Sequence, residues 1–312
     1  GYFEVSIKKG ESVTFSGGVS PIETQSLNAL FAAEVEQRTP RDNFKNCLIN
    51  SAHQFLNKQD GESYILAGYP WFKCRARDMF ISLPGLSIGE VGKFEMIMDT
   101  AIKAVYAFME GKDSHLKVTE IEHPDVLLWM VWTIQQYAKM VSWDEARVKY
   151  GKLLKDVMEY LAGSKHPNLT VHDNGLVYTN GKEKAVTWMN STVNGRPVVA
   201  RTGYIVEFNA LWYNALCFVA DLLAGDEGFA AYLRQFAEKA APSFIQTFLN
   251  EYGYLLDYVD GNMMDWSVRP NMIFAAAFDY SPLDSKQKKG VIDIVTKELL
   301  TPKGLRSLSP KS

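Results

Sequence analysis

The pattern of hydrophobic and polar positions changes abruptly beyond the middle of the chain. Residues 187–201 are rich in Asn, Gly, Thr and Arg and do not suit a regular helix or strand. The next segment, 205–223, is apolar around its whole circumference, which in a helix indicates burial on all sides. Within it Glu207, Asn209 and Asn214 are polar, and burying such groups is costly unless they are paired or used. We therefore predict that this loop and helix form one wall of a polar pocket.

Apolar residues recur at helical spacing over most of the remaining chain. The segment 169–180 is the exception and is predicted as a β-hairpin, because Asn174-Gly175 suits the positive φ angles of a type I′ turn. All-apolar helices alternate with amphipathic ones, which indicates an all-α fold, an (α/α) toroid of helical hairpins with its pocket at the loops before the inner helices. The other predicted helices cover residues 24–36, 41–58, 88–109, 125–140, 143–162, 226–249, 270–278 and 284–300.

The two ends of the chain differ from this pattern. Residues 1–18 alternate like a pair of strands around a Lys-Lys-Gly turn and contain no signal-peptide pattern. We interpret residues 1–22 as a short β remnant, the tail of a preceding β domain, and residues 23–312 as a truncated (α/α) barrel domain. The other end reads LLTPKGLRSLSPKS and has no closing element, so we expect a missing C-terminal segment of a parent protein.

Composition narrows the class of protein. The net charge is -3 and no block of Lys or Arg occurs, which argues against nucleic acid or an anionic membrane surface as a partner. The longest apolar runs, 126–133 and 215–220, are too short to span a bilayer. Cys47, Cys74 and Cys217 are widely spaced, and the five histidines match no metal motif. We therefore predict no cofactor, no metal and a reducing, cytoplasmic location.

Aromatic residues are frequent, with 7 Trp, 15 Tyr and 17 Phe. Their flat apolar faces and polar edges suit sugar rings as well as protein interiors. Tyr69 and Trp71 lie in one aromatic motif that precedes Arg77-Asp78. An Arg and an Asp together at a helix start can clamp sugar hydroxyls. The alternative, which spacing alone favours, is a carboxylate that stabilises the helix dipole beside a salt bridge.

Two further motifs combine aromatic or amide side chains with charge. The first is Trp188-Met189-Asn190 with Arg201 and Glu207, which offers a stacking surface, hydrogen bonds and one carboxylic acid. A core Trp with a satisfied buried Glu is the equal alternative. The second motif lies in one loop before a helix. A calcium site is conceivable there, but the loop lacks the usual spacing of calcium ligands. A solvated loop with helix caps is at least an equal alternative. Its residues are Asp257, Asp260, Asp265, Arg269 and Asn271.

Four motifs in order also carry a family resemblance: GYPWF…RD, TWMNS…GRPV…R…VEFNALWYNAL, VDG…D…RPN and LLTPKGLRSLSP. From about Thr24 onward the chain resembles the C-terminal glucosidase domain of glycogen debranching enzymes. The resemblance implies an (α/α)6 barrel that acts as an inverting amylo-α-1,6-glucosidase. Its partner would be an α-glucan, from which it would remove single α-1,6-linked glucose stubs.

Two departures from the family bear on catalysis. The family reads W-G-R-D where this chain has Arg75-Ala76-Arg77-Asp78, and many members have an Asp, the expected general acid, where this chain has Asn190. An amide cannot supply a proton. The family's general base is expected beyond the LSP motif, and an inverting glycosidase needs both carboxylates. We therefore predict that the chain binds α-glucan weakly but is incomplete for hydrolysis.

The predicted site follows from the motifs and the resemblance together. Glu207 is the candidate acid, and Asn190 occupies the family's acid position. A non-catalytic α-glucan-binding barrel and a purely structural module are the alternatives. Six residues are expected to converge on one cavity: Arg77, Asp78, Trp188, Arg201, Glu207 and Arg269. The full set of predicted sugar-binding residues is Tyr69, Trp71, Arg77, Asp78, Trp188, Arg201, Asn209, Trp212, Asp260, Asp265, Arg269 and Asn271.

Overall fold

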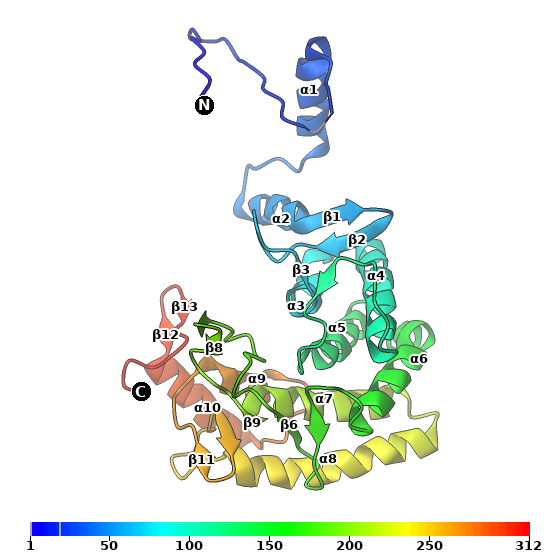
Figure 1. Cartoon of the computed structure of the whole chain (residues 1–312), viewed down its shortest axis with the longest axis vertical. Helices are drawn as coiled ribbons and strands as arrows, with labels where there is room; N and C mark the ends of the chain where they lie inside the picture. Colours follow the sequence, from blue (N-terminus) through cyan, green and yellow to red (C-terminus); the bar gives the residue numbers. More distant parts are fainter. Residues whose placement is uncertain (1, 19) are drawn as a thin grey trace. The chain divides into compact units, whose positions relative to one another are not determined.

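The structure, a computed structural model, describes residues 2–18 and 20–312. About half of these residues are helical, in ten α-helices and two short 3-10 helices, and short strands form small sheets (Figure 1). The chain divides into two compact units between Leu56 and Asn57, and each unit is described by itself. The predicted domain boundary after residue 22 remains a prediction.

The first unit is helical with little buried surface. A 3-10 helix at Thr24–Ser26 leads into α1 (Leu27–Gln37), and Asn43 caps α2 (Phe44–Phe55) by accepting a hydrogen bond from Asn46 N. Both predicted helices are therefore confirmed, although α2 is shorter than expected. The predicted N-terminal strand pair is wrong, since residues 2–18 contain a turn but no strand. An isolated two-stranded hairpin is at best marginally stable in water, and none of residues 2–18 is buried.

The second unit begins within a two-stranded sheet of β1 (Leu56–Gln59) and β2 (Glu62–Ile65). β3 (Cys74–Arg75) pairs in parallel with β4 (Val118–Thr119), and the helix start predicted at Arg77-Asp78 is confirmed because the next helix begins at Ala76. The helices of this unit are α3 (Ala76–Leu86), α4 (Val91–Met109), α5 (Val126–Met140), α6 (Trp143–Ala162), α7 (Val206–Leu222), α8 (Glu227–Phe248), α9 (Ile273–Ala277) and α10 (Ser285–Glu298).

Side-chain caps set where several of these helices begin. Ser142 accepts a hydrogen bond from Glu145 N, which allows the very short turn between α5 and α6. Asp226 caps α8 in the same way, and Asp284 opens α10 with a full capping box.

Helix α7 is the most buried helix of the second unit and packs against α5, α6, α8 and α9. Its predicted burial is confirmed for most positions. Tyr213, Cys217 and Asp221 form one stripe that is partly exposed. Among the described residues the helices do not close into a ring, so the toroid remains a proposal.

The prediction of an all-α fold with a single hairpin insertion needs correction. The predicted hairpin is present but forms the edge of a five-stranded antiparallel sheet in the order β11-β10-β9-β6-β5. These strands are β5 (Thr170–Val171), β6 (Val177–Thr179), β9 (Gly203–Ile205), β10 (Tyr258–Asp260) and β11 (Met263–Met264). Two further pairs are β7 (Thr192–Val193) with β8 (Arg196–Pro197), and β12 (Leu300–Thr301) with β13 (Gly304–Leu305).

The turn of the β5–β6 hairpin is also not the predicted type I′. Gly175 has a φ of +82°, but Asn174 is not in the left-handed region. Gly175 N donates to His172 O at 2.9 Å, so a tight turn is followed by one left-handed glycine. Gly175 also packs closely against α8, where an added Cβ would lie 2.8 Å from Ala240 N.

Candidate functional site

The pairing of β9 with β10 brings together three charged residues that are distant in sequence. Arg201 precedes β9, Glu207 lies in the first turn of α7 and Asp257 directly precedes β10. Val206 N, at the start of α7, donates to Asp257 O at 3.1 Å. This junction of two strands and one helix fixes the positions of all three side chains.

Arg201 is shared between two buried carboxylates. Its Nη2 donates to Glu207 Oε2 at 2.6 Å, and its Nη1 contacts Glu207 Oε1. Its Nε donates to Asp257 Oδ2 at 2.8 Å, and Nη2 also reaches Asp257 Oδ1 at 3.0 Å. All three residues are at most 2% exposed. Hydrogen bonds between ionised groups are strong when the groups are buried, and these bonds hold each carboxylate in one orientation.

The charges of this cluster affect one another. Burial opposes the charge of Arg201, but Asp257 and Glu207 overcome this and hold the pKa of its guanidinium above the usual value. Burial raises the pKa of Glu207, and the nearby Arg201 opposes that shift. Arg269 adds a second positive charge, with its Nε 3.6 Å from Asp257 Oδ2. That buried Nε has no hydrogen-bond partner among the described residues.

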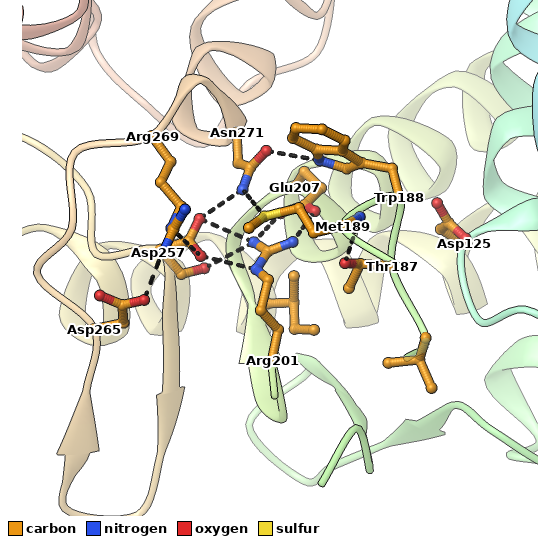
Figure 2. Close-up of polar contacts among 12 residues, drawn as sticks. Asp125, Thr187, Trp188, Met189, Arg201, Glu207, Asp257, Asp265, Arg269 and Asn271 are labelled. Carbon is orange, nitrogen blue, oxygen red and sulfur yellow. Dashed lines mark hydrogen bonds and ion pairs between the residues drawn. The ribbon is translucent and has the colours of Figure 1, made fainter. Parts of the chain in front are cut away.

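A chain of hydrogen bonds links this cluster to an aromatic ring (Figure 2). Asn271 Nδ2 donates to Asp257 Oδ1 at 2.7 Å, and Trp188 Nε1 donates to Asn271 Oδ1 at 2.8 Å. The amide of Asn271 therefore has a defined orientation, because a flip would break both contacts. This hydrogen bond fixes the Nε1 edge of the Trp188 ring, while the side chain remains 42% exposed.

A second buried ion pair lies where α3 packs on α5. Arg77 donates to both carboxylate oxygens of Asp125, each at 2.8 Å, and Trp129 Nε1 donates to Asp125 Oδ2 at 3.1 Å. Arg77 Nη2 also lies 3.0 Å from His123 Nδ1. Burial and the adjacent Arg77 lower the pKa of His123, which suits a neutral imidazole that accepts this hydrogen bond. Arg77 therefore pairs with Asp125 rather than with its neighbour Asp78.

The two ion pairs face one cavity of about 340 Å³. Of the six residues expected to converge there, Arg77, Trp188 and Glu207 line it, whereas Arg201 lies behind Glu207 and Asp78 is exposed on α3. Figure 2 shows Asp125 apart from the Arg201 cluster. The remaining lining is largely apolar. It comprises Ile81, Asp125, Trp129, Pro270, Asn271, Ile273, Phe274 and Leu305.

A family model described as amylo-alpha-1,6-glucosidase matches residues 50–312. The chain belongs to this family. No curated protein matches the chain. The amylo-alpha-1,6-glucosidase match includes both ion pairs and every residue that lines the cavity.

Two features are absent from the described residues. No helix is long and apolar enough to cross a membrane. No group of three or more His, Cys, Asp or Glu side chains is placed to hold a metal ion. In the loop where calcium was conceivable, Asp257 faces Arg201, whereas Asp260 accepts from Tyr178 and pairs with Lys182. Both carboxylates therefore already have side-chain partners.

Several predicted sugar-binding residues lie elsewhere in this member of the amylo-alpha-1,6-glucosidase family. Tyr69 and Trp71 line a different cavity, of about 660 Å³. Asn209 bonds both Val177 N and Val177 O, and Trp212 Nε1 donates to Gly175 O, so both join α7 to the hairpin.

The other predicted positions are at the edge of the site or outside it. Asp265 Oδ2 is 4.0 Å from Arg269 Nε, so Asp265 contributes a third carboxylate near the Arg201 cluster. Asn190, at the family's acid position, is exposed and does not line the cavity.

The sequence analysis missed Asp125 and Trp129. Asp125 directly precedes the all-apolar start of α5, and its side chain does not cap that helix. A carboxylate directly before an all-apolar helical segment was the signal available in the sequence. Its partner Arg77 is 48 positions away, so the pair itself was not visible.

Gly203 determines how closely β9 approaches β10, and Gly203→Ala is expected to destabilise the second unit. Gly203 has a φ of +91°, and an added Cβ would collide with the carbonyl oxygen of Val259. The backbone strain alone costs about 1–3 kcal/mol. Gly195→Ala is the matched control, because Gly195 has a φ of +78° with nothing within 4 Å of its added Cβ. Equal losses in urea unfolding would show that the contact with Val259 is unimportant.

Proposed function

We propose that the cavity binds the terminal glucosyl unit of an α-glucan in an enzyme that acts on α-1,6-linked branch-point glucose, and that this chain is incomplete for hydrolysis because it supplies no general base. Family membership supports a glycosidase of the glycogen-debranching type. The size of the cavity, about 340 Å³, is near the lower end of the usual range for ligand pockets and suits a small ligand such as one sugar ring. Its aromatic walls suit the apolar face of a sugar.

The observation that carries the proposal is the pair of oriented carboxylates in this cavity. Asp125 and Glu207 come from separate segments, and each is held by two contacts from one arginine. Fixed carboxylates accept hydrogen bonds from sugar hydroxyls without having to reorder. The aromatic residues Trp129, Trp188 and Phe274 line the same cavity.

In the proposed inverting reaction, Glu207 protonates the leaving oxygen while water gives its proton to a general base, attacks the anomeric carbon from the opposite face and yields β-glucose. Burial raises the pKa of Glu207, which is the direction that a general acid requires. Its contacts with Arg201 favour the ionised form and must weaken before Glu207 can carry a proton. We assign no base, because Asp125 is held by Arg77 and Trp129.

The second candidate is a non-catalytic α-glucan-binding barrel. It is favoured by Asn190, which cannot donate a proton, and by the arginine contacts that bind both cavity carboxylates. The two candidates share the same ligand and differ only in turnover.

Three finer proposals accompany the function. We propose an (α/α)6 toroid with α7 as an inner helix, because α7 packs against four other helices. We propose that the barrel domain begins near residue 23, since helical structure starts at Thr24. We propose a cytoplasmic location, which the free thiols of the three cysteines support.

Binding of a small glucose mimic tests the proposal. We expect 1-deoxynojirimycin to bind the chain and Trp188→Ala to weaken that binding about tenfold, because the ring forms a wall of the cavity. Tyr232→Ala is the control, since Tyr232 is a partly exposed ring of α8 that does not line the cavity. Absence of binding, measured by calorimetry, would contradict the proposal.

Turnover by this chain tests whether it is incomplete for hydrolysis. The probe is a maltooligosaccharide that carries one α-1,6-linked glucosyl stub, followed by proton NMR of the anomeric signals. Binding without release of glucose is the expected result, because no base is assigned. Release of glucose would contradict incompleteness: β-glucose would support an inverting glycosidase, and α-glucose would contradict inversion.

A further inference from the structure

An exposed group of aromatic rings lies beside a groove that shares no lining residue with the cavity. Tyr252 is 73% exposed and Trp266 is 42% exposed. Tyr252 stacks on Tyr254 with ring centroids 6.4 Å apart and meets Trp266 edge-on at 6.2 Å. Large aromatic side chains gathered at the surface in this way often mark a binding site.

The rings are held in place by the local backbone. Asn250 Oδ1 accepts hydrogen bonds from Tyr252 N at 3.0 Å and from Tyr254 N at 3.3 Å, which fixes the turn that carries both tyrosines. The Tyr254 hydroxyl donates to Trp266 O at 3.4 Å. A ligand that stacks on these rings would therefore find them already ordered, which lowers the entropy cost of binding.

The groove next to the rings has a volume of about 510 Å³ and a polar wall. Glu298 accepts from Ser309 Oγ at 2.9 Å and from Lys311 Nζ at 2.8 Å, and Asp265 also lines the groove. Two carboxylates face one lysine, so the groove carries no positive excess that would attract a phosphate or a nucleic acid. Hydroxyl groups, which both donate and accept, match this lining better.

We propose that this groove binds internal glucosyl units of an α-glucan chain as a second sugar site, an inference that rests on the proposed function. Sugar rings stack on Tyr252 and Trp266, and their hydroxyls donate to Asp265 and Glu298. The groove is open to solvent, so a chain can lie along it without presenting an end. Two sites on one molecule raise the effective concentration of glucan at the cavity.

The test uses β-cyclodextrin, a closed ring of α-linked glucose that has no chain end and cannot place a terminal glucosyl unit in the cavity. We expect it to bind the wild-type chain in a calorimetric titration. Trp266→Ala and Tyr252→Ala are each expected to weaken that binding about tenfold. Trp266→Phe retains a ring and is expected to bind nearly as well as wild type, which separates lost stacking from lost folding.

Two variants serve as controls. Tyr232→Ala removes a partly exposed ring that packs on Phe236 away from the groove, and Trp188→Ala removes a wall of the cavity, so neither is expected to change cyclodextrin binding. The proposal is overturned if β-cyclodextrin does not bind, or if Trp266→Ala and Tyr252→Ala bind it as well as wild type. Binding of 1-deoxynojirimycin in that case leaves the proposed function standing, and its absence removes both.

Discussion

Replacing Arg201 with methionine is expected to lower the free energy of unfolding by about 3–5 kcal/mol. The guanidinium is the shared partner of Glu207 and Asp257, and all three side chains are buried. Methionine leaves two carboxylates in the interior, where Asn271 donates to Asp257 and the Nε of Arg269 lies 3.6 Å from Asp257 Oδ2. A loss of this size is a large part of the 5–15 kcal/mol that typically stabilises a domain, and urea unfolding monitored by circular dichroism measures it.

The pH dependence of this loss identifies its cause. Without Arg201, burial and the nearby Asp257 carboxylate hold the folded-state pKa of Glu207 above its unfolded value. A raised carboxyl pKa means that stability is lost as the pH rises through the folded-state value and is recovered as the pH falls. The deficit of Arg201→Met should therefore shrink between pH 7 and about pH 5. Adding Glu207→Gln to this variant should also recover stability, because it removes one buried charge.

Arg234→Met is the matched control for Arg201→Met. Arg234 pairs with Asp221 at 3.2 Å, but the two side chains are 51% and 45% exposed. Exposed ion pairs contribute about 0–1 kcal/mol, so this variant should unfold nearly as wild type does. If the two methionine variants lost equal stability, the Arg201 cluster would have no special structural role.

The sequence predicted best where one segment contains its own explanation. Helix α7 was predicted from apolarity around its whole circumference, and the structure confirms a buried helix at Val206–Leu222. The starts of α6, α8 and α10 were also predicted to within one residue, since each helix begins directly after a polar residue. Such features depend on residues within one or two helical turns, which a single sequence displays directly.

The five-stranded sheet was not predicted, because no single segment of the sequence displays it. Its strands have only two or three residues each, too few for an alternating pattern to emerge. β9 lies between β6 and β10, and its partners come from segments on both sides in the sequence. Pairing of this kind depends on tertiary packing and not on local propensity.

The candidate site was predicted only in part, because several of its contacts also join residues that are far apart in the sequence. Arg77, Trp188, Glu207 and Asn271 do line one cavity, as polar groups in loops and helix starts suggested. Arg201 and its partner Asp257 are 56 positions apart, so their contact had no local trace. Trp212 was predicted as a stacking surface but is fully buried, because a single sequence cannot distinguish an aromatic ring in a core from one in a pocket.

The last prediction concerns His166, which is buried between the rings of Phe108 and Tyr160. Its Nδ1 accepts from Asn168 N at 3.1 Å, so Nε2 carries the proton and has no partner among the described residues. Burial lowers the pKa of His166 to about 4, while Asp125 and Glu122 oppose the shift. The folded protein therefore holds this imidazole neutral at a pH where the unfolded chain would protonate it.

The difference between the folded and unfolded pKa of His166 determines how stability changes with pH. A lowered histidine pKa contributes stability that is present above the unfolded value of 6.5 and is lost as the pH falls toward 4. Wild type should lose about 3 kcal/mol of unfolding free energy over this window through His166, at about 1.4 kcal/mol per unit. His166→Gln should lack this loss, whereas His115→Gln, which replaces an exposed histidine, should retain it. Parallel pH profiles for wild type and His166→Gln, or an NMR titration of His166 near pH 6.5, would contradict the prediction.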